Sequence, residues 1–319
     1  MAAAAAAYFL VGPTAAGKTA VAEFLARRTG AFVLSADSML VYRGMDVGTA
    51  KPGPGERAEG RLRGIDLAGP DEPFSAGRWL EAARCAFAEA EKAGRDVIVA
   101  GGTGLYVSAL LRGVDEPPAT PEIRAAVAAL AREGGSAALA ARAEELRPGS
   151  TAGVDAANPR RLARLVEILL GGGEPPRPRG ARAPDEARAA PLAGLDFPPE
   201  ELRARIARRA AAMFAGGGME REASALCAAH PGFETSTAGA GIGYAEALAL
   251  LRGEISEEEA VERTAARTRR LAKRQRTWWR TQAKVEWARG PEDASDVARA
   301  ARDVAAIWEK HGKTPVVLP

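Results

Sequence analysis

The sequence is poor in cysteine, with only Cys85 and Cys227 among 319 residues. Two cysteines cannot build a disulfide framework or a zinc site with four cysteine ligands, so we expect a protein of a reducing, cytoplasmic compartment. The sequence also lacks an apolar run of about 18 residues, the length that a membrane helix needs, so we expect no membrane partner. The alanine-rich start over residues 1–7 has no positively charged segment and leads directly into an apolar run, which argues against a signal peptide.

What the sequence does contain is a phosphate-binding loop pattern, Gly12-Pro-Thr-Ala-Ala-Gly-Lys-Thr19. An apolar run over residues 8–11 precedes it and predicts a buried strand, and residues 20–28 after it have the apolar spacing of a helix. In such a loop the backbone N–H groups surround phosphate oxygens, the lysine faces the outer phosphates and the hydroxyl after it ligates Mg²⁺. The diphosphate-binding residues that we expect are Gly12, Pro13, Thr14, Ala15, Ala16, Gly17, Lys18 and Thr19, with Thr19 as the ligand of Mg²⁺.

Two further strands are predicted to end at chemically useful residues. The run over 31–34 leads to Asp37, and the run over 96–100 leads to a glycine turn that contains Thr103. Ser75 is the expected N-cap of a helix that extends to about Ala93. The carboxyl ends of parallel strands meet at one edge of a sheet, so Asp37 and Thr103 are expected near the phosphate loop.

The sequence changes character at Glu116. Apolar spacing predicts helices over 122–133, 136–146 and 158–170 with no strand between them, and a Pro/Gly-rich linker over 171–180 follows. A strand over 191–195 and helices over about 199–215 and 219–229 then resume the first pattern. We therefore expect an α/β fold, a P-loop NTPase-like parallel sheet flanked by helices, over residues 1–115 and 190–319. Residues 116–189 form an inserted, small all-helical domain.

A strongly basic segment lies near the C-terminus. Residues 263–289 contain ten Lys or Arg and one acid, Glu286, for a net charge of +9 over 27 residues. Because no Gly or Pro interrupts them, we expect one long helix, docked through Ala265, Ala272, Gln275 and Trp279. So many cations without acids favour a polyanionic partner, and nucleic acid is the expected one. The interleaved tryptophans are expected to be packing residues.

Taken together, these blocks resemble the bacterial tRNA dimethylallyltransferases, a family also called tRNA isopentenyltransferases. The resemblance runs nearly end to end and depends on the phosphate loop and on the blocks at residues 35–44, 48–52, 101–107, 158–162, 241–244 and 268–278. It implies transfer of a dimethylallyl group from its diphosphate to the N6 amine of the adenosine next to the anticodon, with Mg²⁺ as cofactor. The loop would hold that diphosphate and not ATP. The implied partners are dimethylallyl diphosphate and the anticodon stem-loop of tRNA, and we expect a monomer.

The resemblance also implies roles for particular residues. Lys18 and an arginine, for which Arg209 is favoured within 205–209, would stabilise the diphosphate, Asp37 would accept the amine proton, and Thr103 would bind the phosphate or the base. The helical domain would hold the anticodon loop, and the basic helix would contact backbone phosphates. The expected tRNA-binding residues are Asp37, Ser38, Met39, Leu40, Thr103, Arg124, Arg160, Arg161, Leu162, Ala163, Arg164, Arg267, Arg270 and Arg274.

Three departures from the family pattern stand out. Leu40 replaces a common glutamine and so removes one polar contact to the base or its neighbour. Arg63 and Gly64 stand where a His-His pair is frequent. Ala16 replaces a serine at a free position of the loop.

Three other functions stay open at this point. A P-loop small-molecule kinase would share the loop, the Mg²⁺ and the sheet, although it leaves the basic helix unexplained. A second alternative is an enzyme that prenylates free adenine nucleotides. A third is a non-catalytic RNA-binding protein switched by a phosphate ligand, against which Lys18, Asp37 and Thr103 together argue.

Overall fold

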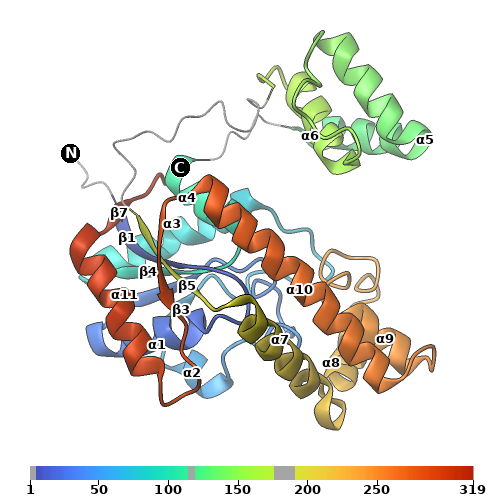
Figure 1. Cartoon of the computed structure of the whole chain (residues 1–319). Coiled ribbons are helices and arrows are strands. Elements are labelled where there is room, and N and C mark those ends of the chain that lie inside the picture. The colour runs from blue at the N-terminus through green and yellow to red at the C-terminus, as the bar shows by residue number, and fades with distance from the viewer. Residues whose placement is uncertain (1–4, 114–118, 176–190, 319) are drawn as a thin grey trace. The chain divides into compact units, whose positions relative to one another are not determined.

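The computed structural model describes residues 5–113, 119–175 and 191–318 (Figure 1). The chain divides into two compact units, residues 1–113 with 190–319, and residues 114–189. The predicted boundaries near residues 116 and 189 and the linker beyond residue 175 lie outside the described residues. None of the described helices is long and apolar enough to cross a membrane.

The larger unit is built on a parallel sheet with the strand order β3-β2-β4-β1-β5-β6. A short seventh strand, β7, pairs antiparallel with β1 through Ala7 and Thr314. The α/β fold with a parallel sheet flanked by helices is therefore confirmed. The strands are β1 (Ala6–Val11), β2 (Phe32–Ser35), β3 (Leu62–Arg63), β4 (Val97–Gly101), β5 (Leu192–Asp196), β6 (Val285–Arg289) and β7 (Thr314–Pro315).

Helices connect and cover these strands. The helices of the larger unit are α1 (Lys18–Thr29), α2 (Pro54–Ala58), α3 (Ala76–Lys92), α4 (Gly104–Arg112), α7 (Pro199–Phe214), α8 (Gly218–Ala229), α9 (Tyr244–Leu251), α10 (Glu257–Gln282) and α11 (Val297–His311), with a short 3₁₀ turn at Ala215–Gly217. The predicted N-cap of α3 is confirmed, since the Ser75 hydroxyl accepts a hydrogen bond from the Arg78 amide.

The main core lies between the sheet and the pair α1 and α11, which pack side by side (Figure 1). Val21 and Leu25 of α1 and Val304 of α11 meet Leu10 and Ile98 of the strands there. This burial of apolar side chains fixes α1 directly behind the end of β1, which is where the phosphate loop must be held.

Trp79 fixes the connection between α3 and the sheet. Its indole N–H donates to the Ser35 carbonyl at 2.9 Å, and its ring stacks on Tyr106 of α4 with centroids 4.5 Å apart. The loops that follow β2 and β4 therefore leave the sheet from a rigid base.

The predicted single helix over 263–289 is wrong at its C-terminal end. Helix α10 ends at Gln282, Ala283 is extended, and β6 then pairs in parallel with β5 from Leu192–Val285 to Asp196–Arg289. Val285 and Trp287 are residue types that favour strands, and β6 pairs with the free edge of β5. The absence of Gly and Pro from the segment gave no sign of this pairing. The short strands β3 and β7 were also not predicted.

The smaller unit is a helical pair, α5 (Pro121–Leu146) and α6 (Pro159–Leu170), around a core that includes Val127, Leu139 and Leu165. Helix α5 is interrupted at Gly135, whose φ of 58° and ψ of −149° are not helical, so the two helices predicted over 122–133 and 136–146 are present. Asn158 caps α6 through the Arg161 amide.

Candidate active site

The phosphate loop joins β1 to α1 at the carboxyl edge of the sheet. Gly17, at φ 85°, is the N-cap of α1 and has no capping side chain, so the first N–H groups of the helix face the loop unpaired by a cap. Gly12 has φ 139°, and a Cβ there would lie 2.2 Å from the Leu195 carbonyl oxygen. The geometry is that of an anion-binding helix N-terminus.

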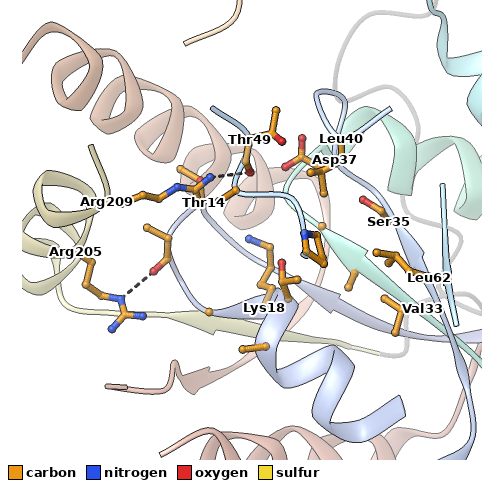
Figure 2. Close-up of a pocket in the computed structure, with 18 of the residues that line it drawn as sticks. Thr14, Lys18, Val33, Ser35, Asp37, Leu40, Thr49, Leu62, Arg205 and Arg209 are labelled. Atoms are coloured by element: carbon orange, nitrogen blue, oxygen red, sulfur yellow. Dashed lines mark hydrogen bonds between the residues drawn. The ribbon is translucent and has the colours of Figure 1, made fainter. Parts of the chain in front are cut away.

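A cavity of about 460 Å³ opens beside this loop (Figure 2). Three parts of the chain contribute cations, a carboxylate and apolar side chains to its wall. The lining residues include Thr14, Ala15, Lys18, Thr19, Val33, Asp37, Leu40, Leu62, Arg205, Arg208, Arg209 and Gln275. One cavity therefore brings together the loop, the end of β2 and helix α7.

Lys18 lies half-buried in this wall, and its Nζ donates to the Pro13 carbonyl at 2.6 Å. Burial lowers the pKa of Lys18 to about 8, and the Asp37 carboxylate and the Arg209 guanidinium act on it in opposite directions. These three charges therefore form one electrostatic group, in which an added anion would favour the charged ammonium.

Arg209 reaches the cavity from α7 and donates to the Thr49 carbonyl at 2.9 Å (Figure 2). Burial lowers the pKa of this guanidinium, while Asp37 raises it. Arg205, one turn earlier, donates from Nε to the Ala15 carbonyl at 2.9 Å and covers the ring of Phe197 at 4.4 Å. Arg209 thus lies opposite Asp37, whereas Arg205 supports the backbone of the phosphate loop.

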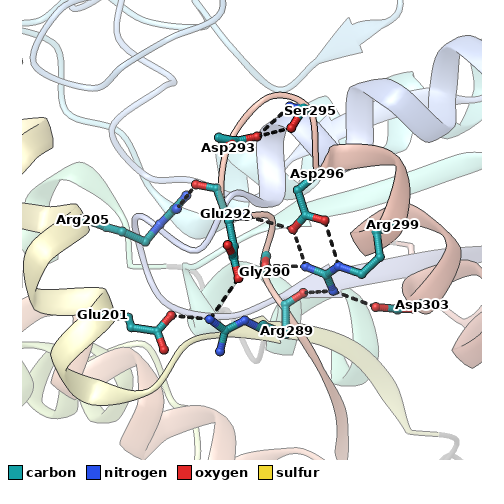
Figure 3. A network of polar contacts seen from close by, with 10 residues as sticks. All are labelled: Glu201, Arg205, Arg289, Gly290, Glu292, Asp293, Ser295, Asp296, Arg299 and Asp303. Atoms are coloured by element: carbon teal, nitrogen blue, oxygen red, sulfur yellow. Dashed lines mark hydrogen bonds and ion pairs between the residues drawn. The ribbon is translucent and has the colours of Figure 1, made fainter.

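Arg205 also contacts the loop that contains Glu292, and ion pairs fix this loop (Figure 3). Arg205 donates to the Glu292 carbonyl at 2.8 Å, and the Glu292 amide donates to Asp296. Asp296 is paired with Arg299 at 2.6 Å, which holds the pKa of that carboxyl at about 2. This network steadies the segment whose Pro291 packs directly against Gly17.

Asp37 lies just past β2 and lines the cavity, as predicted from its position. Its Oδ1 accepts the Met39 amide at 2.9 Å, which fixes the carboxylate in a turn, while no hydrogen bond to Oδ2 is found among the described residues. For Thr103, the predicted contact with the phosphate or the base stays a prediction. Thr103 does not line the cavity, and its Oγ1 accepts the Ser38 amide at 3.0 Å, so its hydroxyl ties the two loops together.

Leu40 is 8% exposed and forms an apolar wall with Val33 and Leu62. The leucine found in place of the common glutamine therefore extends an apolar surface. Met39 packs close to Gly241, where an added Cβ would be 2.7 Å from its methyl carbon.

Sequence reasoning missed Glu222 and the internal role of Lys51. The Glu222 carboxylate accepts the amides of residues 46, 47 and 48 and the Tyr244 hydroxyl, at 2.6–3.1 Å. The Lys51 ammonium is fully buried and contacts Asp46 and Asp66. Together these side chains hold the loop that presents the Thr49 carbonyl to Arg209. A lone glutamate in α8 carries no sequence signal of such a role.

The expectation that the basic segment has no compensating acids is wrong. Five of its ten cations pair with carboxylates, two of them on the same helix and three on other elements; the pairs are Arg263–Glu259, Arg267–Glu246, Arg269–Glu262, Arg276–Asp196 and Arg289–Glu201. Arg267 donates to both oxygens of Glu246 and to the Ala240 carbonyl, so it does not stand free to meet a phosphate. Arg270 and Arg274 have no ion pair among the described residues. Trp279 is buried as expected, whereas Trp287 is 37% exposed.

In the smaller unit, the arginines expected to bind tRNA lie at the surface, whereas Leu162 beside them is buried. Arg124 and Arg160 are exposed, Arg161 lies 3.8 Å from Asp155, and Arg164 pairs with Glu167. Leu162 is fully buried in the core of this unit and Ala163 packs against it, so the predicted contact of Leu162 with tRNA would have to come from its backbone.

The residues that the structure describes contain no group of three or more His, Cys, Asp or Glu side chains that could hold a metal. Thr19 lines the cavity with an exposed side chain. A Mg²⁺ ion bound mainly through phosphate oxygens and water, with one protein hydroxyl, fits this donor set.

Comparison with known proteins shows the family of this chain. Residues 40–282 match the family model described as IPP transferase. The tRNA dimethylallyltransferase of Anaeromyxobacter dehalogenans strain 2CP-C is 46% identical over 292 residues, which cover 91% of this chain and 97% of that protein. The tRNA dimethylallyltransferase of Acidothermus cellulolyticus is 38% identical over 296 residues, which cover 91% of each chain. The solved tRNA isopentenylpyrophosphate transferase of Bacillus halodurans is similar with a TM-score of 0.65 at 31% identity, and the match covers 95% of this chain and 97% of that one.

Proposed function

Since the chain belongs to the IPP transferase family, we infer that it is a tRNA dimethylallyltransferase. It transfers a dimethylallyl group from dimethylallyl diphosphate to N6 of the adenosine 3′-adjacent to the anticodon and releases diphosphate. The observation that carries this inference is that one cavity holds the cations of a phosphate loop, a carboxylate and an apolar wall. These are the three surfaces that the leaving group, the amine and the prenyl chain require.

The first task of the site is to stabilise the leaving diphosphate. As the allylic C–O bond breaks, its electron pair goes to the diphosphate oxygen, and the allylic cation is stabilised by resonance. Lys18, Arg209 and the N–H groups at the start of α1 are placed to neutralise the growing negative charge. Mg²⁺, held by the Thr19 hydroxyl together with the diphosphate, would add further charge neutralisation.

The second task is to activate the acceptor. The N6 lone pair forms the new bond to the allylic carbon, and the amine loses a proton. Asp37 is the proposed acceptor of that proton, because its side chain lines the cavity. Its Oδ1 is held by the Met39 amide, and its Oδ2 has no hydrogen bond among the described residues.

The third task is to keep water away from the allylic cation. Val33, Leu40 and Leu62 form the apolar wall against which the prenyl chain would lie. Leu40 adds apolar area where the family commonly has an amide, so donor binding here depends on apolar contact.

The tRNA must deliver an unstacked adenine to this cavity. We propose that Arg270 and Arg274 contact backbone phosphates and that the helical unit, residues 116–189, holds the anticodon loop through Arg124, Arg160, Arg161 and Arg164. These contacts would position the RNA without reading its sequence. We also propose that the protein acts as a monomer.

The test is incubation of the protein with radiolabelled dimethylallyl diphosphate, Mg²⁺ and bulk tRNA. Label should appear in the RNA fraction. When free adenosine monophosphate replaces tRNA, no labelled nucleotide should form. A parallel reaction with γ-labelled ATP distinguishes the kinase alternative, which predicts phosphate transfer and no prenyl transfer.

A further inference from the structure

One side chain of α10 joins the two glycine loops of the cavity. The Gln275 Oε1 accepts the Thr14 amide at 2.8 Å, and its Nε2 donates to the Gly102 carbonyl at 3.1 Å. Thr14 belongs to the phosphate loop after β1, and Gly102 belongs to the turn after β4. A single amide group therefore spans the gap between two loops that are 88 positions apart in sequence.

The residue types on both sides of this contact are constrained. A side chain here needs an acceptor and a donor on the same terminal group, which only an amide provides at this length. A Cβ on Gly102 would lie 2.3 Å from the Gln275 Nε2, so the glycine leaves the space that the glutamine fills. Three residues along α10, Trp278 covers Gly104 in the same way, with its ring carbons at 2.3–2.5 Å from a built Cβ.

The two loops carry the two reactants of the proposed reaction. The phosphate loop would hold the diphosphate through Lys18, and the turn after β4 holds Ser38, the neighbour of Asp37, through Thr103. The distance between leaving group and amine depends on how these loops are spaced, and small errors in such a distance are costly to the rate.

We propose that Gln275 is a positioning residue that fixes the phosphate loop against the Gly101–Thr103 turn and so aligns the allylic carbon with the acceptor amine. This inference rests on the proposed function for its substrates. It differs from the view of α10 as a surface for tRNA phosphates, because the Gln275 amide bonds to two backbone groups of the protein.

The first experiment replaces Gln275 with methionine, which has nearly the same length and no amide. Gln282→Met is the matched control, because Gln282 is on the same helix and, within the described part of the chain, its side chain bonds only to the neighbouring Thr281 hydroxyl. We expect Gln275→Met to lower kcat by about 10²-fold while the KM for tRNA and the melting temperature stay close to those of Gln282→Met. A Gln275→Glu variant keeps the acceptor for Thr14 and loses the donor to Gly102, so its kcat should also fall.

The second experiment uses the space between Gly102 and Gln275. Gly102→Ala should lower kcat in the native background, because the new methyl group displaces the amide. In a Gln275→Ala background the same change should cost little more, so the double variant is no slower than the slower single variant. Simple multiplication of the two losses would show that the residues act independently and would overturn the proposal.

Other outcomes are equally decisive. If Gln275→Met lowers only the melting temperature, the side chain is a packing residue. If it raises the KM for tRNA without changing kcat, the side chain binds RNA directly. Failure of the wild-type protein to transfer a prenyl group would refute only the proposed function. The positioning role of Gln275 is tested separately, by the binding of inorganic pyrophosphate. Pyrophosphate should bind more weakly to Gln275→Met than to Gln282→Met, and equal affinity would refute the positioning role of Gln275.

Discussion

Asp37, after β2, and Lys18, at the start of α1, face the same cavity although 19 positions separate them. The ammonium is buried, which lowers its pKa to about 8, and the carboxylate limits that fall. In the proposed reaction, Lys18 would face the diphosphate and Asp37 would face the acceptor amine. Each can be tested separately.

Asp37→Asn should lower kcat by about 10²–10⁴-fold, the usual worth of a positioned base, with little change in the affinity for tRNA or for the allyl diphosphate. Asparagine keeps an oxygen for the Met39 amide, so the turn survives while the proton acceptor is lost. Single-turnover kinetics at saturating tRNA give the comparison. Glu81→Gln, at an exposed position on α3, is the control, and a loss of affinity with no loss of rate would make Asp37 a structural residue.

The affinity of the protein for dimethylallyl diphosphate should fall as the pH rises through about 8. Lys18 carries its charge below this pKa and is neutral above it, so the attraction for the diphosphate is present at lower pH and lost at higher pH. Calorimetric titrations between about pH 7 and 9.5 measure this dependence. Lys18→Arg keeps its charge throughout this range and should give a flatter profile; an equally steep fall in that variant would assign the titration to another group.

Replacing Arg270 and Arg274 together with Gln should weaken tRNA binding and leave the KM for the allyl diphosphate unchanged. Each lost phosphate contact reduces the slope of log affinity against log salt by about 0.7–0.9, so the slope should flatten by about 1.5. The loss should be similar for matched and mismatched anticodon loops. Arg263 and Arg269, which pair with glutamates of the same helix, form the control pair. An unchanged slope in the Arg270/Arg274 variant would exclude this face from the tRNA interface.

Arg267→Gln should act on stability rather than on tRNA binding. The Glu246 side chain is only 7% exposed and would lose its charged partner, and breaking such a pair costs about 3 kcal/mol. Urea unfolding measures the change in the free energy of unfolding. Arg263→Gln removes an exposed ion pair and should cost less than about 1 kcal/mol. A flatter salt slope with unchanged stability in Arg267→Gln would restore this residue to the tRNA interface.

Local signals in the sequence were enough for much of the site. Neighbouring residues alone define the phosphate loop and the cap at Ser75. The place of Asp37 follows from the edge that parallel strands share. The resemblance to the family then supplied the reaction, and the match over residues 40–282 confirms the family.

The errors all involve contacts between distant segments. Whether 285–289 forms a strand depends on the free edge of β5, and whether Arg267 is free depends on Glu246 in another helix. The packing of α5 against α6 buries the Leu162 side chain, which the arginines beside it in sequence did not indicate. Gln275 was placed correctly on the docked face of α10, yet its bonds to Thr14 and Gly102 require both loops to be in position. Such pairings leave no trace in the local sequence.

The most direct test of the central claim locates the product on the RNA. The protein is incubated with dimethylallyl diphosphate, Mg²⁺ and an anticodon stem-loop that carries adenosine next to the anticodon, and with a matched stem-loop that carries guanosine there. Nuclease digestion and mass spectrometry should find one prenylated adenosine, at that position, in the first RNA and none in the second. Prenylation of neither RNA, together with phosphate transfer from ATP to a small molecule, would contradict the account.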